Sequence, residues 1–352
     1  MDVPSLPELA QSWDAAKTAD PGARARDIAD KLGVAEGFLA AARVGSAVRP
    51  LRLRGPEFAG LLEQLQSIGP VMTLTRNDAA VHETTGRMGD VATHGTVGQV
   101  TGQIDLRLFL RHWHAGYAMV DETRSGRRHS VQVFDQTGKA VIKIYATGDT
   151  DMDAWAQRLV SYEAAKTEAA PFTISNDVQP EPKPATDVSR DALRAQWQQL
   201  DHSHDFHRML RTLGLDRQQA FQLAGDDLAR AVETDVVERL LRGAAKHGLE
   251  IMCFVGNQGC LQIFSGAVGN VAVMGPWLNV LDPGFNLHLR TDRVAKAWAV
   301  RKPTKLRGTI TSLELFDGRG DLVCQFFGAR PPGASENETW REVLDTAIGG
   351  AS

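Results

Sequence analysis

The chain contains two copies of one sequence. At an offset of about 180 residues, residues 71–91 (VMTLTRNDAAVHETTGRMGDV) align with residues 251–271 (IMCFVGNQGCLQIFSGAVGNV). The alignment continues downstream, where residues 134–146 (FDQTGKAVIKIYA) match residues 316–328 (FDGRGDLVCQFFG). A long-range repeat of this kind indicates that one structural unit occurs twice. The sequence therefore predicts a tandem duplication in which each copy builds its own core.

Each half begins with helical patterns and continues with alternating apolar and polar runs broken by Gly, Asn and Asp. This succession predicts an α+β fold, in which helices pack on antiparallel strands. FDQTG and FDGRG are typical of hairpin turns. Between the halves, residues 175–190 are rich in proline and poor in apolar side chains, as linkers are. We predict an N-terminal repeat over 1–174, a linker over 175–190 and a C-terminal repeat over 191–352.

Composition limits the class of protein. The 352 residues are 43% hydrophobic and carry a net charge of −4, which suits a globular protein and disfavours nucleic acid as the main partner. The chain has no signal-peptide pattern and no apolar run of the ~20 residues that span a bilayer. Three cysteines, Cys253, Cys260 and Cys324, lie in apolar surroundings and favour a reducing compartment. We expect a cytoplasmic protein without membrane insertion, whose cysteines are small buried side chains.

Three histidines occur in DHSHDFHRML (201–210), at the start of a predicted helix. In the repeat alignment His204 and His207 lie opposite Ala23 and Arg26, so the first copy forms its helix without them. On a helical wheel His204 lies nearly opposite the centre of the apolar face. That face is formed by Phe206, Met209, Leu210 and Leu213. A pair of solvated histidines on an exposed helix face is one reading of this segment.

Metal ligation is the other reading. We expect Asp201 or Ser203 to cap the helix and His204 to lie in its first turn. There the positive end of the helix dipole keeps an imidazole neutral and able to bind a metal. One or two histidines are too few for a structural zinc site, but an iron porphyrin needs only one protein nitrogen.

Longer motifs resemble a known family. The segments DFHRMLRTLGLDRQQAFQLAGDDLARAV, EIMCFVGNQGCLQIFSG and TSLELFDGRG are similar to the bacterial hemin-degrading and heme-trafficking factors, the HemS/ChuS/PhuS family. NDAAVHETTG and DLRLFLRHW of the first half agree, and the resemblance covers nearly the whole chain. It implies a tandem α+β fold with heme in a cleft on the C-terminal half and His204 as the axial ligand of the iron.

The resemblance also implies which residues surround the heme. Basic residues of the family attend the propionates and the open face of the iron, and the matching positions are Arg107, Arg217, Lys302 and Arg330. Phe109, Gln325 and Phe327 are expected beside the porphyrin, and His207 as an alternative ligand. Phe327 replaces a tyrosine of the family and therefore lacks its hydroxyl. Arg107 comes from the first half, where it alternates with an apolar row, so the implied cleft needs both repeats.

The sequence leaves three functions open. The first is a carrier that accepts imported heme from an ABC importer and passes it to a heme oxygenase or other acceptor for iron acquisition. The second is a heme-degrading, oxygenase-like enzyme in which Arg107 orients the distal water or oxygen. The third treats the first half as an interaction module. The chain lacks nucleotide, flavin and iron–sulfur signatures, so an enzyme would need an external reductant. Clustered histidines favour the carrier.

Overall fold

The structure is a computed structural model that describes residues 4–45, 47–123, 126–166, 170–174, 188–331 and 334–349. The chain forms two compact units, each of which includes a short segment from the other half of the sequence. The first unit comprises Met1–Arg76, His82–Asn176 and Gly256–Gln262, and the second comprises Asn77–Val81, Asp177–Val255 and Ile263–Ser352.

The first repeat contains five helices and nine strands among its described residues, in the order α1 (Leu6–Ala19), α2 (Ala25–Leu32), α3 (Glu36–Ala42), β1 (Val48–Leu51), α4 (Phe58–Gln64), β2 (Pro70–Arg76), β3 (Ala80–Arg87), β4 (Asp90–His94), β5 (Val97–Thr101), β6 (Asp105–Phe109), β7 (Ala115–Thr123), β8 (Gly126–Phe134), β9 (Ala140–Ala146) and α5 (Met152–Val160).

The second repeat has the same order of elements. They are α6 (Arg190–Trp197), α7 (Asp205–Leu213), α8 (Arg217–Ala224), β10 (Ala229–Val232), α9 (Val236–His247), β11 (Glu250–Gly256), β12 (Cys260–Ala267), β13 (Val271–Met274), β14 (Trp277–Asp282), β15 (Phe285–Arg290), β16 (Val294–Thr304), β17 (Gly308–Asp317), β18 (Leu322–Gly328) and α10 (Glu338–Gly349).

The strand order confirms the duplication. Neighbouring strands run β1-β7-β8-β9-β2-β3 in the first repeat and β10-β16-β17-β18-β11-β12 in the second. The predicted hairpins are also confirmed, because β8 ends at Phe134, the first residue of FDQTG, and β17 ends at Asp317 within FDGRG. The α+β fold of antiparallel strands and helices is therefore present twice. Of the predicted linker, residues 175–187 lie outside the described residues, and the predicted boundaries remain predictions.

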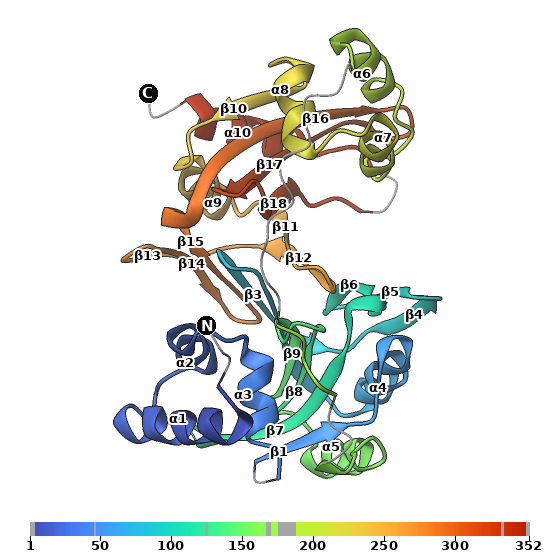
Figure 1. Cartoon of the computed structure of the whole chain (residues 1–352). Coiled ribbons are helices and arrows are strands. Elements are labelled where there is room, and N and C mark those ends of the chain that lie inside the picture. The colour runs from blue at the N-terminus through green and yellow to red at the C-terminus, as the bar shows by residue number, and fades with distance from the viewer. Residues whose placement is uncertain are drawn as a thin grey trace. The chain divides into compact units, whose positions relative to one another are not determined.

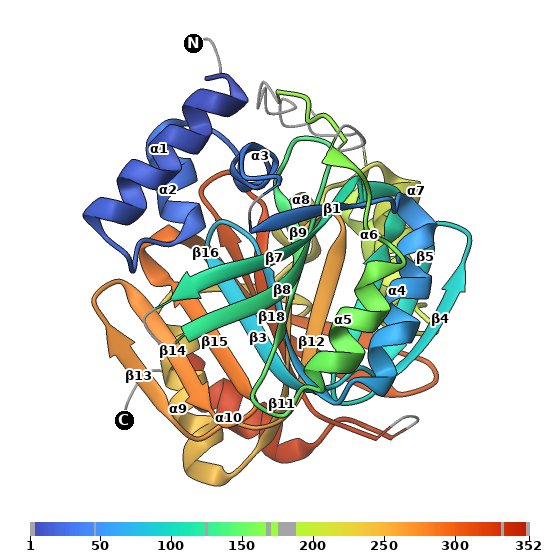
Figure 2. The same ribbon diagram turned by 90° about the horizontal axis from the view of Figure 1, so that it is seen from below.

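Helices cover the sheet of each repeat. In the first, α4 and α5 lie side by side, and α3 contacts both α1 and α2 (Figures 1 and 2). In the second, α9 packs against α10 over a core that includes Leu240, Phe326 and Trp340. A separate cluster of buried side chains joins α6, α7 and α8 to β16 and β17. This second cluster holds the helix that carries the histidines.

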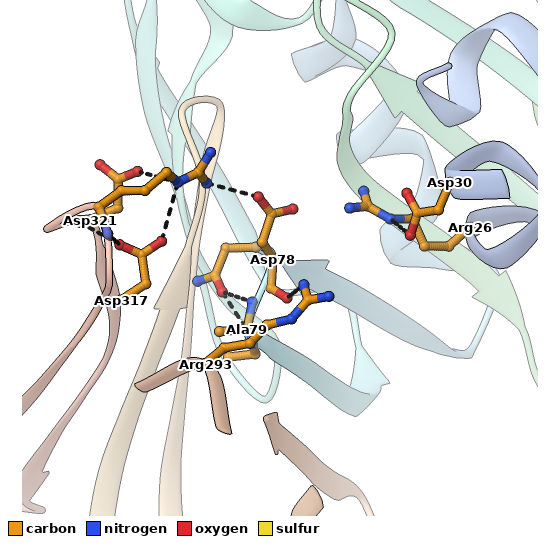
Figure 3. Close-up of polar contacts among 10 residues, drawn as sticks. Arg26, Asp30, Asp78, Ala79, Arg293, Asp317 and Asp321 are labelled. Carbon is orange, nitrogen blue, oxygen red and sulfur yellow. Dashed lines mark hydrogen bonds and ion pairs between the residues drawn. The ribbon is translucent and has the colours of Figure 1, made fainter. Parts of the chain in front are cut away.

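Each unit contains one turn that comes from the other half of the sequence. Asn77 donates from Nδ2 to the Val323 carbonyl at 2.8 Å. The next residue, Asp78, accepts from Arg293 through its carbonyl at 2.7 Å, as Figure 3 shows. Its carboxylate pairs with Arg319 at 2.9 Å. In the first unit Asn257 plays the matching part and donates to main-chain carbonyls of that unit. The two NxxA/C turns are thus equivalent features of the duplication.

Candidate functional site

Helix α7 has the apolar face that the sequence predicts. Phe206, Met209 and Leu210 are buried, whereas His204 and His207 are exposed. The ring of Phe206 packs edge-on against Trp197, with 4.5 Å between centroids. Burial of such a side chain contributes about 1.5–3 kcal/mol. The histidines therefore have no part in the core that fixes the helix.

The expected cap of α7 is wrong. The N-cap is His204 itself, with helical backbone angles, rather than Asp201 or Ser203, so His204 precedes the first turn instead of lying in it. The start of the helix is held by Asp205, whose Oδ2 accepts from the His202 backbone N–H at 2.9 Å. The side chain of Asp205 thus reaches back to the residues before the helix, as the acidic side chain of a capping box does.

His207 is neutral at physiological pH. Partial burial lowers its pKa below the usual 6.5, and the charges of Arg211 and Arg217 lower it further. The lowered pKa keeps a ring lone pair available to a metal above the acidic range. The position one helical turn after His204 puts two imidazoles on the exposed part of one helix.

A buried charge cluster lies beside this helix. Arg217, at the start of α8, donates to both oxygens of Glu314 on β17, at 2.5 and 3.0 Å. Lys302 of β16 donates to the same carboxylate at 2.6 Å. The side chain of Glu314 is fully buried, Lys302 is 3% exposed and Arg217 is 23% exposed. The structure thus brings together two of the four predicted basic residues.

The cluster carries a net positive charge at neutral pH. Burial would raise the pKa of Glu314, but the charges of Arg217 and Lys302 hold it well below its usual range. Burial lowers the pKa of Lys302 to about 8, against the opposing attraction of Glu314. Two cations and one carboxylate leave a single positive charge in a poorly solvated place, where an anion is attracted more strongly than in water.

Aromatic rings adjoin the cations. The Phe206 ring centroid lies 5.3 Å from the Arg217 guanidinium carbon and 5.1 Å from Lys302 Nζ. Phe327 lies 5.7 Å from Lys302 Nζ and packs edge-on against Phe254, 5.1 Å between centroids. A surface that combines cations with aromatic faces suits a flat apolar molecule that carries carboxylates.

The remaining predicted residues of the second unit lie close by in the sheet. Gln325 is buried on β18 directly opposite Glu314 and two residues before Phe327, so both side chains lie on one face of the strand. Arg330 follows the strand, and its Nη1 is buried without a hydrogen-bond partner among the described residues. Burial lowers the pKa of Arg330, while the carboxylate of Glu336 opposes this. Arg330 therefore neighbours a different carboxylate from Arg217 and Lys302.

Arg107 and Phe109 belong to the first unit. They lie on β6 with the predicted alternation, since Leu106 and Leu108 are fully buried while Arg107 and Phe109 are half-buried. Arg107 forms an ion pair with Asp105. Their predicted part at a heme stays a prediction.

Glu314 was not predicted from the sequence. It is the centre of the cluster, and a signal was present, because Glu314 stands between Leu313 and Leu315 in the strand TSLELFD. A buried carboxylate is almost always paired, so such a residue implies nearby cations.

Among the described residues no group of three His, Cys, Asp or Glu could hold a metal ion. All three cysteines are free, and they are buried, as the sequence predicts.

No helix in the described part of the chain is both long enough and apolar enough to cross a membrane.

Comparison with known proteins places the chain among heme-related proteins. A family model described as the haemin-degrading HemS.ChuX domain matches residues 33–162 and again 214–347. The hemin transport protein HmuS of Yersinia pestis is 39% identical over 345 residues, 97% of each chain. The structure of holo-PhuS, a heme-binding protein of Pseudomonas aeruginosa, has a TM-score of 0.92 at 41% identity, covering 97% of this chain and 99% of that one. ChuS of Escherichia coli O157:H7, described as a heme degrading enzyme, has a TM-score of 0.88 at 35% identity over 97% and 99% of the two chains.

Proposed function

Because this chain belongs to the haemin-degrading HemS.ChuX family, we propose that it binds heme on its second unit through His204 and passes it on for iron acquisition. The observation that carries the proposal is the position of Phe206, two residues after the exposed His204 and in contact with both Arg217 and Lys302. The start of α7 thus places an exposed imidazole two residues from a buried ring that adjoins two cations.

The roles of the residues follow from their chemistry. His204 supplies one imidazole nitrogen to the iron, since the porphyrin supplies the other four. Arg217 and Lys302 bind propionate carboxylates, and Phe254 and Phe327 pack against the ring edge. Burial of several hundred Å² of porphyrin contributes on the order of 10 kcal/mol before association costs, which is ample for a carrier.

The carrier proposal includes a cytoplasmic location, an ABC importer as the source of heme and a heme oxygenase or other protein as acceptor. It is supported by two exposed histidines at i and i+3, since a pair of interchangeable ligands favours transfer. Degradation of heme is the second candidate, because ChuS, which is 35% identical to this chain, is described as a heme degrading enzyme. Arg107, Phe109, Gln325 and Arg330 keep their predicted roles around the heme in both candidates.

The ligand is tested by substitution. We expect His204→Ala to lose most of the Soret absorbance of the heme-loaded protein, while His202→Ala, two residues earlier, keeps it. A spectrum of His204→Ala identical to the wild type would show that another residue binds the iron.

Carrier and enzyme are separated by turnover. Heme-loaded protein is incubated with a reductase, NADPH and catalase, so that free peroxide cannot attack the ring. A carrier keeps its Soret band under these conditions. Stoichiometric formation of biliverdin would instead establish the degrading activity.

A further inference from the structure

The buried carboxylate of Glu314 is saturated by donors of its own unit. Its Oε2 accepts from Arg217 Nε at 2.5 Å, and its Oε1 accepts from Arg217 Nη2 at 3.0 Å and from Lys302 Nζ at 2.6 Å. The Ser312 hydroxyl donates to the same Oε1 at 3.0 Å. These donors use the roughly four acceptor positions of a carboxylate. Glu314 therefore fixes two cations and is itself not available to a ligand.

The first repeat builds the same place in its sheet without a carboxylate. The paired register of β8 with β9 begins at Ser130, and that of β17 with β18 begins at Ser312. Two residues further along, Gln132 is the counterpart of Glu314. Gln132 is also buried, and its Nε2 donates to the Ser130 hydroxyl at 3.1 Å. A neutral amide thus satisfies this position of the fold.

The two cations that surround Glu314 are absent from the first repeat as well. The registers of β7 with β8 and of β16 with β17 make Asp121 the counterpart of Lys302. Glu36 begins α3 as Arg217 begins α8. The carboxylate and its two cations therefore occur together in one repeat, and all three are replaced at the corresponding positions of the other.

Folding alone does not account for the cluster. Burial of charged groups costs several kcal/mol per ion, and the replacement of a complete buried ionic group by uncharged residues is often neutral or stabilising. The first repeat forms the same succession of strands with other residues at these positions. The three charges of the second repeat are thus better explained by a ligand than by the fold.

The cations keep donors for such a ligand. Arg217 uses Nε and Nη2 on Glu314, and its Nη1 has no acceptor among the described residues. The rings of Phe206 and Phe221 lie 5.3 and 5.9 Å from its guanidinium carbon, and the side chain is 23% exposed. A guanidinium held by a two-bonded ion pair and by rings has a fixed plane, so its remaining N–H groups point in fixed directions.

We propose that Glu314 is a positioning residue of the heme site, which holds Arg217 and Lys302 so that their remaining N–H groups meet the carboxylates of the ligand. The inference rests on the proposed binding of heme and adds a residue that does not touch the heme. Charge alone predicts the opposite effect, because a carboxylate close to an anionic ligand repels it.

Heme and heme dimethyl ester provide the probes, since they share the iron porphyrin and differ in the charge of the propionates. In titrations at pH 7 we expect the wild type to bind heme at least tenfold more tightly than the ester. Glu314→Gln should bind heme about tenfold more weakly and change the affinity for the ester less than twofold. Unchanged or tighter binding of heme, or an equal loss for both probes, would overturn the proposal.

Two further variants separate positioning from folding. Glu36→Gln removes the buried carboxylate of the ionic cluster in the first unit and should keep the wild-type ratio of the two affinities. Glu314→Asp keeps the charge but is one methylene shorter, so it should fold and show a ratio between those of the wild type and Glu314→Gln. A wild-type ratio in Glu314→Asp would reject the positioning role even if Glu314→Gln did not fold.

Failure of heme binding itself has a different signature. A wild-type protein that develops no Soret band on titration with heme would refute the proposed function, whatever the residue at position 314. A wild-type Soret band together with an unchanged ratio of affinities in the Glu314 variants would reject only the role of Glu314.

Discussion

The guanidinium of Arg217 and the carboxylate of Glu314 form a two-bonded ion pair in the second unit, at 2.5 and 3.0 Å. At the corresponding helix of the first unit the residue is Glu36, and its partners are Lys143 and Arg76. Both repeats thus contain a buried ionic cluster between a helix and the sheet. The helix contributes a carboxylate, Glu36, in the first repeat and a guanidinium, Arg217, in the second. In the second the helix contributes a cation, which an anionic ligand can attract.

We predict that Lys302 makes heme binding dependent on pH. Burial lowers its pKa to about 8, so Lys302 loses its charge as the pH rises from 7 to 9. The interaction with a propionate is lost with it, and a charged hydrogen bond is worth about 1.5 kcal/mol, or tenfold in affinity. We expect the heme affinity to fall about tenfold over this range, measured by titration at each pH.

Two variants test the assignment to Lys302. Lys302→Met should bind heme weakly at pH 7 and show little further loss by pH 9. Lys305→Met, which removes a lysine 53% exposed and 3.5 Å from Asp201, should keep the full pH dependence. The same pH profile in Lys302→Met as in the wild type would assign the titration to another group.

The ionic cluster of the first unit stabilises the fold above acidic pH. Burial would raise the pKa of Glu36, but Lys143 and Arg76 lower it to about 2 from 4.5. A lowered carboxyl pKa contributes stability that is complete above 4.5 and disappears as the pH falls toward 2. We expect Glu36→Gln to lower the free energy of unfolding by about 3 kcal/mol at pH 7. In urea titrations at pH 3 the difference should be less than half of that at pH 7.

The control for this loss is an exposed acid of the same unit. Glu122→Gln breaks the ion pair between Glu122, which is 72% exposed, and Arg127, which is 74% exposed. It should change the free energy of unfolding by less than about 0.5 kcal/mol. A difference between Glu36→Gln and the wild type that stays constant from pH 7 to pH 3 would contradict the assigned pKa.

Local patterns predict much of this molecule. The repeat, the hairpins at FDQTG and FDGRG, the apolar face of α7 and the alternation around Arg107 all follow from residues near one another in the sequence. The cap of α7 was predicted wrongly because the acidic side chain at the helix start, Asp205, lies inside the helix and accepts from His202, which precedes it.

Other features depend on distant parts of the chain. Arg217, Lys302 and Glu314 come from three elements, and their meeting depends on which strands are neighbours. The family resemblance supplied the two cations but not the carboxylate between them.

Phe327 lies between Lys302 and Phe254, and its counterpart in the first repeat is Tyr145. Phe327→Tyr adds a hydroxyl that can donate to the bound ligand, and such a bond is worth about 1 kcal/mol. We expect heme affinity to rise about fivefold in competition titrations. The counterpart change in the other repeat, Tyr145→Phe, should leave heme affinity unaltered; unchanged or weaker binding by Phe327→Tyr would show that the added hydroxyl finds no acceptor in the bound state.

We predict that His207 acts in the release of heme and not in its binding. Its lowered pKa keeps the imidazole neutral at physiological pH, and its place one turn after His204 would let it take the iron as a bond to His204 breaks. We therefore expect His207→Ala to keep the wild-type Soret band but to transfer heme to apomyoglobin several-fold more slowly, measured by stopped-flow absorbance. Arg208→Ala, which removes the exposed neighbour of His207, serves as control and should transfer at the wild-type rate. Wild-type transfer by His207→Ala would mean that heme leaves directly from His204, and the second histidine would then be only a solvated residue of the helix surface.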